Sequence, residues 1–352
     1  MSIATLFGTE LPLVQGPMAG ATTPEMVVAV CEAGALGSLP SATYSLEQLR
    51  AALEKVKAGT RRPFNLNFFC HTPPEPDPAA QMRWRARLAP YYVEEGLDPA
   101  APVPAGNRAP FDDATCALVE EFRPAVVSFH FGLPAEPLLA RVRATGAKII
   151  SSATTVAEGR WLEAHGVDAV IAMGYEAGGH RGTFLGLDMT TQPGTMALVP
   201  QMVDAVKVPV IAAGGISDPR GVAAAFVLGA AGVQVGSAYL HTPEASIPAL
   251  HRAALRDTAE RGTAVTNLFT GRPARGLVNR LMREVGPLSE HAPAFPTAGG
   301  AVAPLRAAAE AAGRDDYTSM WAGQAAGLAH PMPAAEMTRW LMRGQSNKVG
   351  GN

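Results

Sequence analysis

The stretch KIISSATTVAEGRWLEAHGVDAVIAM, residues 148–173, decides the fold. It begins with a non-alternating run of strand length (148–153), continues with a segment of helical periodicity (156–165) and ends in a second, mostly apolar run (168–173). Both runs are nearly continuous rather than alternating, which is typical of parallel strands covered on both faces. The stretch therefore predicts a strand–helix–strand unit of an α/β protein.

The same unit recurs on both sides of this stretch. Strands are predicted at residues 13–15, 35–39, 64–69, 125–131, 148–153, 168–173, 209–213 and 232–236. Helices are predicted at 24–34, 45–59, 112–122, 136–145, 156–165, 196–206 and 219–228, with Ser45 as an N-cap and Gln48 completing a capping box. Eight such strands favour a (β/α)8, or TIM, barrel. A doubly wound open sheet would explain the alternation but not the number of strands.

Two segments interrupt this rhythm. Residues 71–111 are rich in proline and show little periodicity apart from a helix around 81–88, so they predict a long insertion after the third strand. Beyond residue 243 the pattern predicts a helix to about residue 258 and further helical stretches. We therefore expect a barrel from residues 1–242 plus parts of 300–352, and a helical subdomain, residues 243–330, packed on it.

Composition excludes several classes of protein. The 352 residues carry 29 Lys and Arg against 31 Asp and Glu, a formal net charge of -2, and 47% are hydrophobic. These values argue against a disordered chain and give no electrostatic signature of a nucleic-acid or membrane partner. Three widely spaced cysteines predict neither a disulfide framework nor a zinc site. No signal peptide or membrane span is recognisable, so we expect a cytoplasmic protein without a metal.

The most informative loop follows the sixth predicted strand and reads MGYEAGGHRGTF, residues 173–184. Its glycines, Gly178 and Gly179 among them, favour a close approach of the backbone to a ligand. A structural histidine would more often sit on a helix or in a packed turn, so we predict that His180 is catalytic, as a proton acceptor near neutral pH. Arg181 is either a solvated loop charge or a substrate contact.

The loops after the last two strands indicate a phosphate site. They read AAGGISDPRG (212–221) and QVGSAY (234–239), and in barrels these two loops commonly bind phosphate. Gly214 and Gly215 would offer unobstructed N–H groups, and Gly236 and Ser237 further donors. This predicts FMN or a phosphorylated substrate. The chain has no P-loop, HExxH or GxSxG motif, and no GxGxxG in its first strand–helix unit.

Other strand ends point to the same mouth. QGPMAG (15–20) follows the first strand and is either an ordinary turn or backbone lying against a flat ligand, with Met18 as an apolar wall. Asn67 ends the third strand and His130 ends the fourth. Each is either a functional group or a hydrogen-bonded structural residue.

Together the segments QGPMAG, 151–184, AAGGISDPRG and QVGSAY resemble nitronate monooxygenases, over roughly residues 10–330 and including WAGQAA from Trp321. The resemblance implies oxidation of alkyl nitronates by FMN and O2, through a flavin semiquinone, to a carbonyl compound and nitrite. It implies propionate 3-nitronate as substrate, with detoxification as the role, and places the active-site histidine at His180. The cofactor contacts that we predict are Met18, Ala19, Asn67, Met173, Gly178, Gly179, Gly214, Gly215, Gln234, Val235, Gly236 and Ser237.

The sequence departs from the family pattern at one position and leaves the substrate contacts and two alternative functions open. Met173 stands where the family often has glutamine, which puts the tuning of the flavin in doubt. The predicted substrate contacts are His130, Arg181, Tyr317 and Trp321, the last two one helical turn apart, with Tyr91 or Tyr92 as further candidates. An FMN-dependent NAD(P)H enoyl-acyl-carrier-protein reductase and a flavin-storing barrel are the alternatives. For the oligomeric state we allow for a homodimer.

Overall fold

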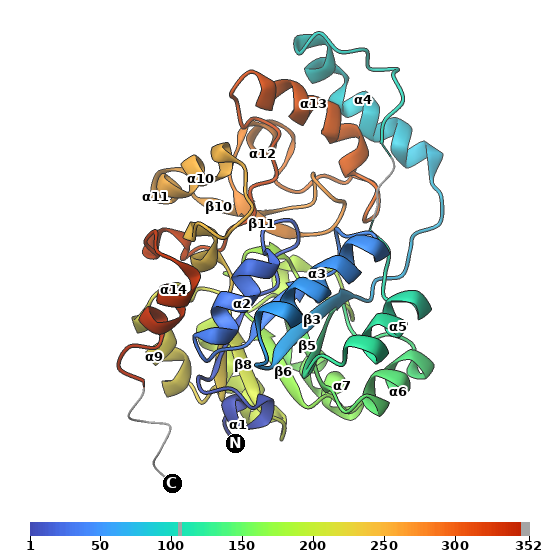
Figure 1. Cartoon of the computed structure of the whole chain (residues 1–352). Helices are drawn as coiled ribbons and strands as arrows, with labels where there is room; N and C mark the ends of the chain where they lie inside the picture. The colour runs from blue at the N-terminus through green and yellow to red at the C-terminus, as the bar shows by residue number, and fades with distance from the viewer. Residues whose placement is uncertain (105–107, 346–352) are drawn as a thin grey trace.

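The computed structural model describes residues 1–104 and 108–345, and its main sheet closes into a barrel (Figure 1). Eight parallel strands follow one another in the order β1-β9-β8-β6-β5-β4-β3-β2. The two end strands meet at a bridge between Val14 and Leu36, where the N–H of Gln15 donates to the carbonyl of Leu36 over 2.9 Å. The (β/α)8 barrel is therefore confirmed, and the open sheet is wrong.

The elements of the barrel lie close to their predicted positions. Its strands are β1 (Leu13–Gln15), β2 (Gly37–Pro40), β3 (Phe64–Phe69), β4 (Val126–His130), β5 (Lys148–Ala153), β6 (Ala169–Met173), β8 (Val210–Ala213) and β9 (Gly232–Val235). Its helices are α1 (Ile3–Phe7), α2 (Pro24–Glu32), α3 (Leu46–Gly59), α5 (Asp113–Phe122), α6 (Glu136–Ala144), α7 (Val156–Ala164), α8 (Thr195–Ala205), α9 (Pro219–Val227) and α14 (Ala334–Leu341). The predicted capping box of Ser45 and Gln48 is present at α3.

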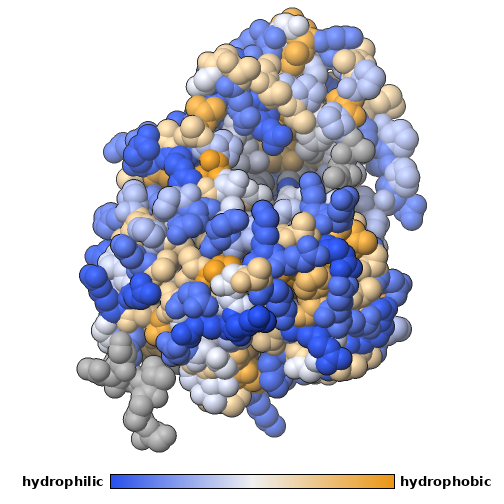
Figure 2. All heavy atoms as spheres, viewed as in Figure 1, coloured by the Kyte–Doolittle hydropathy of each residue, from blue (hydrophilic) through white to orange (hydrophobic). Residues whose placement is uncertain are grey.

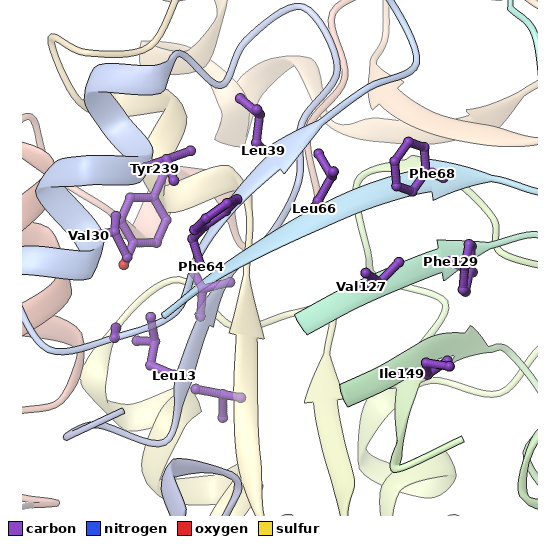
Figure 3. Close-up of a cluster of buried hydrophobic side chains, with 14 of the residues drawn as sticks. Leu13, Val30, Leu39, Phe64, Leu66, Phe68, Val127, Phe129, Ile149 and Tyr239 are labelled. Carbon is purple, nitrogen blue, oxygen red and sulfur yellow. The ribbon is translucent and has the colours of Figure 1, made fainter. Parts of the chain in front are cut away.

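Burial explains why these segments form a barrel. Strand side chains that point outward fill the space below the helices, as Figure 3 shows for Leu66, Phe68, Val127 and Phe129. Side chains that point inward, such as Ile150, form a second cluster with α1, which closes the amino-terminal end of the barrel. Only the carboxyl-terminal end is left to form a site.

A cap stands over that end, seen as the upper lobe of Figure 1. It consists of α4 (Pro78–Glu94) and of residues 249–321, which contain α10 (Ala249–Arg256), α11 (Thr258–Arg261), β10 (Thr263–Thr266), β11 (Ala274–Leu277), α12 (Arg280–Val285) and α13 (Gly299–Ala311). Its own buried cluster joins α4 to α13, and the indole N–H of Trp84 donates to the carbonyl of Ala298 over 3.0 Å. Hydrophilic residues dominate the face shown in Figure 2.

The cap differs from the prediction in two ways. The sequence predicts a long loop with a helix over about 81–88, but 17 residues form α4, because Pro78 begins the helix and Pro90 is tolerated inside it. The sequence predicts helices alone beyond residue 243, but β10 and β11 form an antiparallel pair there. On its other side β11 pairs with β7 (Gly179–His180), two residues of the glycine-rich loop. The domain boundary at residue 242 stays a prediction.

Candidate active site

A cavity of about 510 Å³ lies between the barrel mouth and the cap. Loops that follow β1, β6, β8 and β9 form one wall, and cap residues form the other. Most of the residues predicted from the sequence line this cavity, and the structure thus brings them together. They are Met18, Ala19, Asn67, His130, Met173, Gly178, Gly179, His180, Gly214, Gly215, Gln234, Gly236, Ser237 and Trp321. Their roles stay predictions.

The barrel wall is made largely of exposed backbone. Gly214 and Gly215 have φ angles of 103° and 71°, which residues with a side chain rarely adopt. A Cβ added to Gly236 would meet only Met18, with its sulfur 3.7 Å away, so the missing side chain leaves room in the cavity. Gly178 is different, because a Cβ there would collide with the backbone nitrogen of Gly323, whose N–H donates to Ser237 Oγ of the same wall.

One polar group on this wall lacks a partner. Gln234 lies on β9, and its buried Oε1 has no hydrogen-bond donor among the described residues. A buried unpaired amide oxygen is costly, so its presence facing a cavity fits a ligand that donates to it. Nearby, Asn67 is already bound, since its Nδ2 donates to Ser128 Oγ over 2.9 Å. The glycines and Gln234 together fit a flat, phosphate-bearing cofactor such as FMN.

His180 lies where barrel and cap meet. It belongs to β7, where it pairs with Ala274 of β11, and its Nε2 lies 3.0 Å from Thr270 Oγ1. The imidazole is buried, and burial together with the positive charge of Arg108 holds its pKa well below the ordinary value. His180 is therefore neutral near neutral pH and able to accept a hydrogen bond or a proton.

His130 supports this arrangement from β4. Its Nε2 lies 3.1 Å from the carbonyl oxygen of His180, and its Nδ1 lies 3.0 Å from Ser152 Oγ. Because a carbonyl only accepts, the hydrogen-bond network assigns the proton to Nε2, and Nδ1 accepts from the serine. Burial lowers the pKa of His130 to about 4. The neutral His130 thus fixes the backbone at His180.

Aromatic rings enclose the His180 imidazole. The ring centroids of Phe295 and Trp321 lie 5.3 and 5.5 Å from it, and that of Phe69 lies 6.0 Å away. Phe131 completes this group with a φ of 71°, an unusual value for a bulky residue, and the guanidinium of Arg272 lies 4.0 Å from its ring centroid. These rings cover much of the imidazole, which is 9% exposed and faces the cavity.

Three predicted contacts do not line the main cavity, although one of them, Tyr317, lines a smaller side cavity. Val235 points into the hydrophobic core, because side chains alternate along β9 and its neighbour Gln234 takes the cavity side. Arg181 is fully buried and donates to the carbonyls of Met173 and Gly174, so we withdraw it as a substrate contact. Tyr317 does not line the main cavity.

Tyr317 and Trp321 also do not share a helix. They lie in an extended segment after α13, where Trp321 forms a bridge with Gly276. The Tyr317 ring packs against Tyr91, with the centroids 6.0 Å apart, and Tyr92 donates its hydroxyl to the carbonyl of Ala301 over 2.6 Å. Only Trp321 of these aromatic residues lines the main cavity, and the others hold the cap together.

Sequence reasoning missed several residues of the cap wall. Arg108, Arg306 and Ser319 line the main cavity and also a side cavity of about 190 Å³. His251 on α10 is buried in the same wall, and its Nε2 has no partner within residues 1–104 and 108–345. No sequence motif marks these residues, because each stands in a segment without a strand end or a glycine loop beside it.

The described residues contain no group of three or more His, Cys, Asp or Glu side chains that could hold a metal ion. Nor does any helix among them have the length and apolar character needed to cross a membrane.

Fold and cavity place the chain among the (β/α)8-barrel enzymes whose active site opens at the carboxyl ends of the strands. Residues 2–344 match the model of the nitronate monooxygenase family. Nitronate monooxygenases of Paraburkholderia phytofirmans and Pseudomonas aeruginosa are each 41% identical to the chain, over 97% and 96% of it and 94% and 97% of their own lengths. The crystal structure of nitroalkane oxidase from Streptomyces ansochromogenes is 37% identical, with both chains fully covered and a TM-score of 0.88.

The chain therefore belongs to the nitronate monooxygenase family, a family of oxidoreductases. Flavin dependence is general in this family. The resemblance seen in the sequence is confirmed.

Proposed function

We propose that this protein binds FMN in the main cavity and oxidises alkyl nitronates with O2 to a carbonyl compound and nitrite. Family membership supports nitronate oxidation in general. The finer proposal is that propionate 3-nitronate is the substrate and that its removal is the physiological role. A cytoplasmic location and a homodimer are also proposals, which cell fractionation and light scattering would test.

The observation that carries the flavin proposal is the unpaired Gln234 Oε1 beside a glycine-lined wall. In this proposal Gln234 accepts a hydrogen bond from the ring system, and Met18 packs against it. The N–H groups of Gly215 and Ser237 bind the phosphate, as the loops after the last two strands do in many barrels. Bound flavin would supply electron transfer between the nitronate and O2.

The chain's own residues prepare the substrate. A nitronate is an anion, and its negative charge lies mainly on the oxygens of the nitro group. In the nitroalkane, the neutral His180 would accept the α-proton. In the nitronate, the same imidazole would hydrogen-bond to an oxygen as a donor, from a ring nitrogen that carries the proton. The aromatic neighbours limit the directions from which a substrate can approach the imidazole.

The test is the visible spectrum of the purified protein, followed by an assay of nitrite released from propionate 3-nitronate. We expect a yellow protein, with FMN as the released flavin, and nitrite formation well above that of free FMN. A colourless protein that cannot be reconstituted with FMN would overturn the proposal. A flavin-containing protein without nitrite release would indicate flavin storage instead.

One further measurement separates the enoyl reductase alternative. That enzyme must accept hydride from NAD(P)H, so NADH would bleach its flavin rapidly under anaerobic conditions. We expect slow or no bleaching here, and reduction by the nitronate instead. The reverse result, rapid bleaching by NADH together with reduction of an enoyl thioester, would favour the reductase.

A further inference from the structure

The structure assigns a second function to the cap wall: we propose that Arg108 and Arg306 form an anion subsite that selects nitronates carrying a distal carboxylate. This inference rests on the proposed nitronate oxidation and adds its substrate recognition. Both arginines line the main cavity and the side cavity, so they stand at the junction of the two. The hydroxyl-bearing Ser319 lines both cavities as well.

Charge balance at this junction favours an anion. Other arginines of the chain, such as Arg141, Arg280 and Arg314, pair with carboxylates at 2.6–2.8 Å. In the described part of the chain neither Arg108 nor Arg306 forms such a pair, and residues 105–107 and 346–352 contain no Asp or Glu that could supply one. Each guanidinium therefore has its fork of N–H donors available for a ligand.

The opposing charge at the junction is small. Glu310 is the one carboxylate that lines the main cavity among the described residues, and its Oε1 accepts a hydrogen bond from Thr318 over 2.9 Å. The side cavity is lined by both arginines and, within residues 1–104 and 108–345, by no acidic residue. The junction thus carries an excess of positive charge.

Arg108 is also placed at the reacting end of the cavity. Its guanidinium carbon lies 5.9 Å from the ring centroid of Phe295, and the His180 ring lies 5.3 Å from the same centroid. The positive charge of Arg108 contributes to lowering the pKa of His180. His180 and both arginines line the main cavity, so a small molecule inside it would place a nitronate at His180 and a carboxylate at the arginines.

The test compares two nitronates that share the reacting end. Propionate 3-nitronate carries a carboxylate, whereas propyl nitronate carries a methyl group in its place. For Arg108→Gln we expect kcat/KM for propionate 3-nitronate to fall by about tenfold or more, as the loss of a charged hydrogen bond predicts. Arg306 is exposed, so Arg306→Gln should lower the same value by a smaller factor, about twofold to fivefold. We expect kcat/KM for propyl nitronate to stay within about twofold under the same assay conditions.

Further variants make the result specific. Arg108→Lys keeps the positive charge and should restore part of the preference. Arg283→Gln removes an exposed arginine of α12 outside both cavities and should change neither substrate. As a readout independent of turnover, malonate should perturb the flavin absorbance of the wild type and bind at least about tenfold more weakly to Arg108→Gln. Flavin content and thermal unfolding show whether each variant is folded.

The outcomes separate the two proposals. Equal losses for both nitronates, or no loss for either, would overturn the anion subsite while leaving nitronate oxidation intact. A wild-type protein that oxidises neither nitronate would overturn the proposed function itself. A wild type that uses both nitronates equally well would also overturn the subsite, because the arginines would then confer no selectivity.

Discussion

The two walls of the main cavity are built in different ways. The barrel wall presents glycines and backbone groups, such as those of Gly215 and Gly236, from loops that follow the strands. The cap wall presents long side chains, among them Arg108, Arg306 and Trp321. A backbone surface changes only when the chain moves, whereas a side-chain surface changes with single substitutions. We therefore expect the barrel wall to determine the cofactor and the cap wall to determine the substrate.

The largest effect is expected at His180, where the walls meet. His180→Ala removes the imidazole that contacts the nitro group or its α-proton, and nitrite release should fall by about 10²–10⁴-fold. Steady-state kinetics with both nitroalkane and nitronate measure this, with flavin content as a check on folding. The control is His165→Ala on the far side of α7, whose ring stacks on Trp161. Unchanged turnover in His180→Ala would refute the assigned role.

A smaller loss is expected at the barrel wall. Gly178→Ala places a methyl group against the backbone of Gly323, so this part of the barrel wall must shift, at a cost of about 1–3 kcal/mol. Flavin should then be lost on dialysis more readily than from the wild type. Gly186→Ala is the matched control, because an added Cβ there meets nothing within 4 Å. Full flavin retention in Gly178→Ala would show that the wall is softer than its geometry indicates.

Acid should weaken the cap wall through His251. Burial lowers the pKa of this histidine to about 4, so it is protonated in the unfolded chain before it is protonated in the folded one. The contribution of the neutral His251 to the free energy of unfolding is fully present above the ordinary histidine pKa and is lost as the pH falls toward 4. At pH 5 the loss amounts to about 2 kcal/mol relative to neutral pH. Urea unfolding of His251→Gln should therefore depend less on pH between 7 and 5. An unchanged pH dependence would contradict this.

The smallest effect links the two walls electrostatically. Arg108 lowers the pKa of His180, so Arg108→Gln removes a positive charge and makes His180 easier to protonate. The acidic limb of the pH–rate profile should therefore move to higher pH. Propyl nitronate is the substrate for this measurement, because its rate does not depend on carboxylate binding. An acidic limb that stays in place or moves to lower pH would show that Arg108 does not influence the protonation of His180.

The same comparison explains what the sequence could predict. The eight strands of the barrel are recognisable because both of their faces are buried, one under the helices and the other in the barrel interior, and this burial leaves continuous apolar runs such as residues 169–173. The glycine loops are recognisable because their function requires missing side chains. Alternation along a strand would have corrected Val235, since Gln234 already occupies the cavity side.

The cap was harder to predict because its partners are distant in sequence. Trp84 and Tyr92 of α4 are buried against residues more than 200 positions away, so no local apolar stripe marks a barrel-type helix. Strand β11 contains the buried Arg275, whose guanidinium binds backbone carbonyls, and a charged residue in a short segment does not indicate a strand. Arg108 follows no motif at all. Such residues become visible only when the fold brings them to the cavity.

The short strand β7 has a mechanical consequence. His180 is bonded to the barrel through the chain and to the cap through its pairing with Ala274, and the N–H of Arg181 extends this ladder to the carbonyl of Pro273. The cap cannot swing open as a rigid flap without either breaking these hydrogen bonds or pulling the imidazole with it. Any movement of the cap would therefore displace the imidazole of His180, and the ¹⁵N chemical shifts of its ring nitrogens would report the position of the cap.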